Sequence, residues 1–132
     1  MKHGCVVLAD VHHPMLGAIE GLLKSMFDTV VMVSSFESLL EATQKIRPDL
    51  IVADLSLPSS DGRKLLLNLD ERLSTFRMII LGTYKDRDIL DSIMKKGAKG
   101  YVLKQATATD LPEAVDKVLN GETYVSPSVE SG

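Results

Sequence analysis

The chain has 132 residues, of which 45% are hydrophobic and 25% charged, and its formal net charge is -3. This composition is ordinary for one globular domain that buries about two-thirds of the surface of its unfolded chain, and it excludes collagen-like and disordered chains. Positive and negative charges are interspersed without a basic block, which argues against direct nucleic-acid binding.

Short apolar runs recur along the chain, at residues 5–9, 30–33, 50–53, 78–81 and 101–103. Each run is continuous rather than alternating and is rich in branched side chains. This pattern is typical of strands that are buried on both faces of a parallel sheet. We therefore expect a strand at each of these positions.

Between the runs, apolar residues recur at spacings of three and four, as on one face of a helix. The predicted helices have apolar positions spanning residues 15–27, 36–46, 65–73, 89–94 and 111–119. Strands that alternate with helices in this way predict an α/β domain of three layers, with right-handed crossovers that place helices on both faces of the sheet.

Several residues mark the expected ends of these helices. A capping box of Ser34 and Glu37 is predicted to open the helix at 36–46, and Pro48 follows its end. Gly97 is predicted to end the helix at 89–94 in a left-handed conformation. Pro112 is expected in the first turn of the last helix, where its missing N–H is harmless.

The segment after Gly121 is rich in serine and lacks a periodic pattern. We expect residues 1–121 to form the domain and residues 122–132 to be a tail or linker. Cys5 is the only cysteine, which excludes a disulfide within the chain. No apolar stretch approaches the length of a signal peptide or a membrane span, so a cytoplasmic location without a membrane partner is predicted.

Polar side chains follow four of the predicted strands. Asp10 follows the first strand, Asp54 the third, Gly82 and Thr83 the fourth, and Lys104 the fifth. In open parallel sheets, ligands bind outside the carboxyl ends of the strands, where the strand order reverses. We therefore expect two acids, a hydroxyl and a lysine to gather at one edge of the sheet.

These residue types suit phosphoryl chemistry. A carboxylate that attacks a phosphoryl group needs a divalent cation, a cationic side chain and hydrogen-bond donors nearby. Mg²⁺ prefers carboxylates, a backbone carbonyl and water. Asp10, Asp54 and the backbone carbonyl of Ser56 are the candidate magnesium ligands. Lys104 is the candidate cation and Thr83 the candidate hydroxyl donor.

Simpler interpretations exist for most of these residues. Asp10 is equally well explained as a helix cap or turn former. Capping does not explain Asp54, because no helix follows it directly. Most lysines are exposed surface residues, and only its place beside the two acids distinguishes Lys104. His12 and His13 are adjacent, and two adjacent histidines on a loop rarely bind the same metal ion.

The chain resembles the receiver domain of two-component response regulators over about residues 5–128. The resemblance rests on the stretches VVLADVHHP, RPDLIVADLSLPSSDG, GAKGYVLKQAT and LNGETYVSPSV. The last of these is similar to the end of receivers that precede a LuxR-type helix-turn-helix domain. The resemblance implies a flavodoxin-like (βα)5 three-layer sandwich, with a parallel sheet of order 2-1-3-4-5.

The same resemblance implies a signalling domain rather than an enzyme. A sensor histidine kinase would phosphorylate Asp54 with Mg²⁺ bound, Lys104 would contact the phosphoryl group, and Tyr101 would report the switch. The chain is expected to form a homodimer. DNA would be contacted only through a separate C-terminal domain. The face formed by the last two predicted helices and the strand between them would carry the switch, which is expected to couple weakly to dimerisation.

Two departures from the family pattern leave two hypotheses open. Val11 stands where the family usually has a second acid that binds Mg²⁺ directly, so a weakened magnesium site is expected. Gly82 stands at the switch Ser or Thr position, with Thr83 one residue late. The first hypothesis is a receiver that accepts phosphate. The alternative is a degenerate pseudo-receiver, a phosphorylation-independent protein-interaction module.

Two enzyme or cofactor-binding classes with related architecture fit less well. Phosphatases of the haloacid dehalogenase type need a second aspartate two residues after the nucleophile, but that position is Ser56. A flavodoxin would bind the FMN phosphate in a loop rich in Ser or Thr after the first strand, and this chain has no such loop.

Overall fold

The structure is a computed structural model that describes residues 2–11, 15–59, 73 and 75–129. Two features from the sequence analysis lie outside these residues. They are the two adjacent histidines at 12 and 13 and the helix predicted at 65–73, of which only Leu73 is described.

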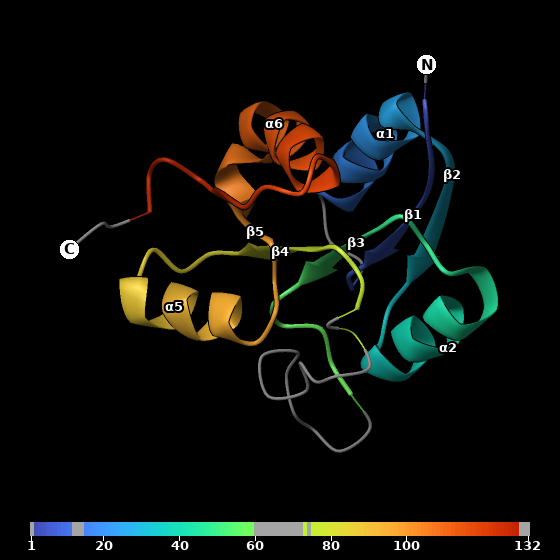
Figure 1. Cartoon of the computed structure of the whole chain (residues 1–132), viewed down its shortest axis with the longest axis horizontal. Coiled ribbons are helices and arrows are strands. Elements are labelled where there is room, and N and C mark those ends of the chain that lie inside the picture. The colour runs from blue at the N-terminus through green and yellow to red at the C-terminus, as the bar shows by residue number, and fades with distance from the viewer. Residues whose placement is uncertain (1, 12–14, 60–72, 74, 130–132) are drawn as a thin grey trace.

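A parallel sheet forms the middle layer of the described structure, with strand order β2-β1-β3-β4-β5-β6 (Figure 1). Its strands are β1 (His3–Ala9), β2 (Phe27–Val33), β3 (Leu50–Asp54), β4 (Met78–Gly82), β5 (Gly100–Leu103) and β6 (Tyr124–Val125). The predicted order of the first five strands is confirmed. A sixth strand adds to the edge beside β5.

Helices cover both faces of this sheet. The described helices are α1 (Leu16–Met26), α2 (Phe36–Ile46), α5 (Arg87–Lys95), the 3-10 turn η1 (Lys104–Ala106) and α6 (Thr107–Leu119). Figure 1 shows α1 and α6 on one side of the sheet and α2 and α5 on the other. The predicted three-layer sandwich is therefore confirmed.

The core has two parts, one on each face of the sheet. Successive residues of β1 alternate between them: Val6 and Leu8 pack with α1 and α6, whereas Val7 and Ala9 pack with α2 and α5. Every residue of β3 and β4 is buried. Burial on both faces explains why these strands are continuous apolar runs rather than alternating ones.

The capping box of α2 lies one residue later than predicted. Ser38 N donates to Ser35 Oγ at 3.1 Å, and Ser35 N donates to Ser38 Oγ at 3.1 Å. The predicted pair of Ser34 and Glu37 is therefore wrong. The register follows from packing, because α2 begins at Phe36 and buries that ring in the core.

The last helix, α6, begins at Thr107 rather than near residue 111, so Pro112 lies inside the helix and not in its first turn. The reason is local. Residues 104–106 form a 3-10 turn that runs directly into α6, and Thr107 Oγ1 donates to Lys104 O at 2.8 Å. The proline has no N–H for the carbonyl of Ala108, which lies on an exposed turn.

The predicted ends of the helices at 36–46 and 89–94 are confirmed, but Phe27, predicted in the first helix, begins β2. The α2 helix ends at Ile46, and Arg47 adopts a left-handed conformation with φ of 44° before the proline. Gly97 and Gly121 follow α5 and α6 with φ of 110° and 88°. Glycine tolerates positive φ because it has no Cβ.

The tail after Gly121 is not simply a linker. Tyr124–Val125 forms β6, which pairs in parallel with β5, and Tyr124, Ser126 and Val129 are buried. A strand of two residues is too short to produce a periodic sequence signal. Among the described residues, none of the helices has the length and apolar composition needed to span a lipid bilayer.

Candidate functional site

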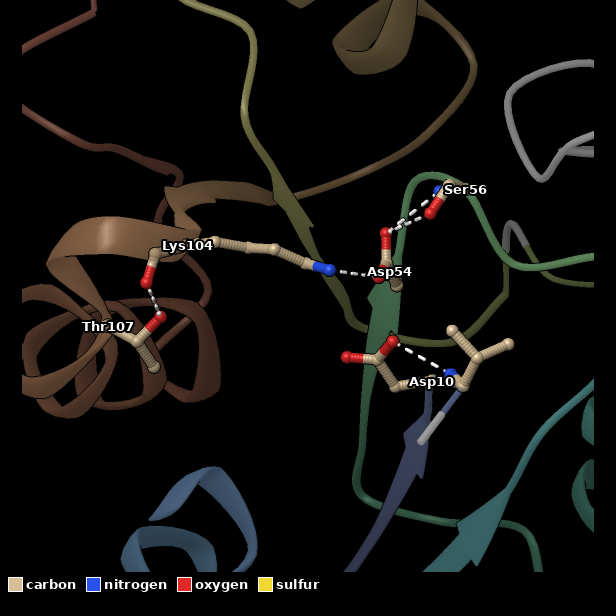
Figure 2. A network of polar contacts seen from close by, with 6 residues as sticks. Asp10, Asp54, Ser56, Lys104 and Thr107 are labelled. Atoms are coloured by element: carbon tan, nitrogen blue, oxygen red, sulfur yellow. Dashed lines mark hydrogen bonds and ion pairs between the residues drawn. The ribbon is translucent and has the colours of Figure 1, made fainter. Parts of the chain in front are cut away.

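The structure brings Asp10, Asp54 and Lys104 together at the carboxyl edge of the sheet (Figure 2). Asp10 follows β1, Asp54 ends β3, and Lys104 follows β5. The parallel register aligns these strand ends, since Ala9 pairs with Ala53 and Gly82 with Leu103.

Both oxygens of the Asp54 carboxylate have donors. Lys104 Nζ makes an ion pair with Asp54 Oδ2. Asp54 Oδ1 accepts hydrogen bonds from Ser56 N at 2.8 Å and from Ser56 Oγ at 2.9 Å. Burial by itself raises the pKa of Asp54, but hydrogen bonds with the side chains of Asp10 and Lys104 and with Ser56 outweigh it and lower the pKa below 3.8. The carboxylate is therefore ionised at neutral pH.

Asp10 is buried beside Asp54 and does not cap a helix. The N-cap of α1 is Met15, so the cap interpretation is wrong. Asp10 Oδ1 accepts from the backbone N–H of the next residue, Val11, at 2.8 Å. Asp10 N donates to Val33 O at 3.0 Å, which holds this residue at the end of the β1–β2 ladder.

Lys104 is not an ordinary surface lysine. Only 19% of its side chain is exposed, and it points across the sheet edge to Asp54. Its backbone carbonyl accepts from Thr107 Oγ1, which fixes the turn that carries it. Figure 2 shows this arrangement, with Ser56 on the far side of Asp54.

The side chain of Ser56 is a site group that the sequence analysis missed, because only its carbonyl was considered. Its hydroxyl and its N–H both bind Asp54 Oδ1. A serine two residues after an aspartate has the spacing of a local side-chain-to-backbone turn. That spacing is the signal from which this contact follows.

The residues after β4 are arranged differently from the acids. Thr83 is exposed, and within the described part of the chain its hydroxyl has no hydrogen-bond partner. Gly82 is buried against Tyr101, and a Cβ at position 82 would lie 2.6 Å from Tyr101 Oη. Tyr101 Oη donates to Tyr84 O at 2.7 Å. Among the described residues, the candidate hydroxyl donor Thr83 therefore makes no hydrogen bond to the acids.

Tyr101 is uncharged in this position. Its side chain is only 1% exposed, and burial raises the pKa of Tyr101 to about 12 despite its hydrogen bond to Tyr84. The negative charge of Asp54 adds to this rise. The hydroxyl of the buried ring is thus a neutral hydrogen-bond donor.

The site offers few side-chain ligands for Mg²⁺. Mg²⁺ is commonly held by one or two carboxylates and several waters, and Asp10 and Asp54 supply two buried carboxylates. No group of three or more His, Cys, Asp or Glu side chains gathers for a metal within the described residues. The apolar, exposed Val11 adds no side-chain oxygen.

Several known proteins are similar to this chain. A model of the response regulator receiver domain matches residues 6–116. The transcriptional regulatory protein DegU of Brevibacillus brevis is 29% identical over 126 residues, which are 94% of this chain and 53% of that protein. The oxygen regulatory protein NreC of Staphylococcus epidermidis is 32% identical over 124 residues, which are 91% of this chain and 56% of that protein. The chain thus spans about half the length of these curated relatives.

Solved structures agree with the fold. The RcsB response regulator of Salmonella typhimurium superposes with a TM-score of 0.85 at 25% identity, covering 98% of this chain and 66% of that one. A two-component response regulator of the LuxR family from Aurantimonas superposes with a TM-score of 0.84 at 20% identity, covering 97% of this chain and 93% of that one. The second likeness concerns the fold alone.

Proposed function

This chain belongs to the response regulator receiver domain family, and on this premise we propose that Asp54 accepts a phosphoryl group from a sensor histidine kinase. One observation carries the proposal: Asp54 is a buried, ionised carboxylate held between Lys104 and Ser56. A lysine ion pair in this position supports phosphoryl chemistry because the same cation can stabilise the charge on a transferring phosphoryl group.

The two oxygens of Asp54 are placed for different tasks. Oδ1 is held by the N–H and hydroxyl of Ser56, whereas Oδ2 faces Lys104. In the proposed reaction Oδ2 attacks the phosphorus of the phosphohistidine, and a P–O bond forms as the P–N bond breaks. The imidazole nitrogen keeps the electron pair of the broken bond and takes up a proton. Lys104 then moves its contact from the carboxylate to the phosphoryl oxygens.

Asp10, Asp54 and the carbonyl of Ser56 are the proposed holders of Mg²⁺. The bound cation would offset the repulsion between the carboxylate and the incoming phosphoryl oxygens. Because Val11 adds no ligand, we expect weaker magnesium affinity than a site with a third carboxylate would have, measurable by isothermal titration.

Phosphorylation by a small phosphodonor tests the proposal directly. The protein is incubated with acetyl phosphate and Mg²⁺, and intact mass is measured. The expected result is the added mass of one phosphoryl group, which hydroxylamine removes because it cleaves acyl phosphates. Asp54→Asn is expected to abolish the added mass. Asp28→Asn, at an exposed position of β2, is the matched control and should behave as the unaltered chain does.

The same experiment distinguishes the degenerate pseudo-receiver. An unmodified mass in a chain whose far-UV circular dichroism shows an intact fold would contradict phosphoacceptance and favour an interaction module. The contacts of Asp54 support the first hypothesis, since a decayed site would not need to keep a buried ion pair, which is costly to desolvate.

We further propose that the output lies in a separate domain after the receiver, with residues 122–132 leading towards it. DegU is named a transcriptional regulatory protein, and RcsB dimers have been solved bound to DNA. Contact with DNA would occur through that output domain, and the receiver would form a homodimer that depends little on phosphate. Light scattering with and without beryllofluoride checks this, and a tight dimer formed only with beryllofluoride would contradict it.

A further inference from the structure

The C-terminal strap, residues 124–129, lies along the edge of β5. Tyr124 N donates to Lys99 O at 3.0 Å, and Ser126 N donates to Tyr101 O at 2.9 Å. Val129 N then donates to Ser126 O at 3.1 Å, so the strap turns back after the second contact. The strap thus continues the sheet beyond the strand that leads to Lys104.

The hydroxyl of Ser126 joins three segments of the chain. Ser126 is 1% exposed, and its Oγ accepts from Leu103 N at 3.0 Å and donates to Asp110 Oδ2 at 2.7 Å. Leu103 ends β5 and directly precedes Lys104, whereas Asp110 lies in the first turn of α6. The side-chain oxygen of Ser126 thus satisfies the N–H of Leu103, whereas its carbonyl accepts from Val129.

The backbone around Lys104 is therefore held by two hydroxyls. Ser126 Oγ fixes the N–H of the preceding residue, and Thr107 Oγ1 donates to the carbonyl of Lys104 itself. The lysine side chain extends from this point to Asp54. Any shift of the turn moves the root of that side chain, so the direction of the ammonium group depends on both anchors.

We propose that Ser126 is a positioning residue for Lys104, and that docking of the C-terminal strap is thereby coupled to the state of the Asp54 site. The coupling to phosphate rests on the proposed function, whereas the positioning of Lys104 does not. Coupling between two sites is reciprocal. If docking of the strap changes the free energy of phosphorylation, then phosphorylation changes the free energy of strap docking by the same amount.

Side-chain dynamics test the positioning without any phosphodonor. In Ser126→Ala, the order parameter of the Lys104 ε-carbon, measured by ¹³C relaxation, is expected to fall. Ser128→Ala is the matched control, because Ser128 is an exposed serine of the same segment and should leave this value unchanged. An unchanged order parameter in Ser126→Ala would overturn the proposal, since a structural role alone does not act on the lysine tip.

The phosphorylation rate tests the coupling. The maximal rate with acetyl phosphate is expected to fall about three- to tenfold in Ser126→Ala, the effect of losing one hydrogen bond of ordinary strength. An equal rate in the two serine variants would overturn the coupling. Should the unaltered chain take up no phosphate, the proposed function would fail, and the order parameter would still decide the positioning of Lys104.

A second pair of variants covers the case in which Ser126→Ala does not fold. Asp110→Asn keeps an oxygen that accepts from the Ser126 hydroxyl, whereas Asp110→Ala removes it. We expect a lower order parameter of the Lys104 ε-carbon only in Asp110→Ala. Equal order parameters in the two variants would count against the proposal, because the partner of Ser126 would then have no effect on the lysine side chain.

Discussion

Two regions of the sheet edge are built in different ways. The acid side, comprising Asp10, Asp54, Ser56 and Lys104, holds two buried carboxyl groups, and Asp54 binds the half-buried Lys104 and the exposed Ser56. On the switch side, comprising Gly82, Thr83 and Tyr101, no hydroxyl makes a hydrogen bond to the acids within the described residues, and the tyrosine ring occupies the space beside the glycine.

The comparison indicates that the two sides are held together by different interactions. The acid side depends on charge. Removing one partner therefore leaves a buried charge with neither a counter-charge nor water to stabilise it. The switch side depends on shape and one hydrogen bond, from Tyr101 to Tyr84 O. Substitutions on the two sides are therefore expected to differ in size and in pH dependence.

Removing the cation of the acid side is expected to have the largest effect. Lys104→Ala leaves the buried carboxylate of Asp54 without its ion pair and should lower the free energy of unfolding by about 3 kcal/mol. Urea unfolding measures the loss. Lys45→Ala is the control, because its ion pair with Glu41 is exposed, at 71% and 68% of the side chains, and should cost less than about 0.5 kcal/mol.

Lys104→Ala is also expected to change how stability depends on acidic pH. Since the pKa of Asp54 is lowered from 3.8 in the folded chain, its stabilisation is present above that value and is lost as pH falls through the folded-state pKa. Lys104→Ala should weaken this acid dependence. A variant as stable as the unaltered chain at pH 7 would show that the ion pair is not what holds the acid side.

Adding a side chain to the switch side is expected to have a smaller effect. Gly82→Thr places a Cβ against the Tyr101 ring, 2.6 Å from its hydroxyl, and should cost about 2 kcal/mol through overpacking. Adding Tyr101→Phe removes the nearest atom and should recover part of the loss. The matched control is Gly21→Ala, where no atom lies within 4 Å and the helix should gain about 0.5–1 kcal/mol. An unchanged midpoint of thermal unfolding in Gly82→Thr would mean that Tyr101 moves aside freely.

Removing the tyrosine hydroxyl is expected to have the smallest effect at neutral pH. Tyr101→Phe loses the hydrogen bond to Tyr84 O and should cost about 1 kcal/mol. The pKa of Tyr101 is raised from 10.0 to about 12, so its contribution is fully present below pH 10 and is lost as pH rises through about 12.

Tyrosinate absorbance measures this alkaline transition. Tyr101→Phe should remove one of the late-titrating groups, and Tyr124→Phe is the comparison, since burial raises the pKa of Tyr124 to about 12 as well. If Tyr101→Phe left the absorbance change between pH 11 and about 12.5 unaltered, the ring would not be held in the buried position that separates the two sides.

Prediction from sequence worked best where the signal was local. Runs such as residues 50–53 and 78–81 predicted strands correctly, because burial on both faces leaves a continuous apolar stretch. It failed at β6, since two residues carry no period, and at the start of α6, where a 3-10 turn precedes the helix. The capping box of α2 was misplaced by one residue because the burial of Phe36 selected the register.

The sequence by itself determined the α/β class, the order of the elements and the placement of Asp54 and Lys104 at strand ends, because periodicity and strand length are properties of neighbouring residues. Only the tertiary structure decided which side chains meet. Asp54 and Lys104 are 50 residues apart, and Leu103 and Ser126 are 23 apart. Whether such pairs bind depends on how the strands align and how the side chains pack, and no local pattern encodes that. The same reason explains why the Tyr101 ring and its hydroxyl occupy the space beside Gly82.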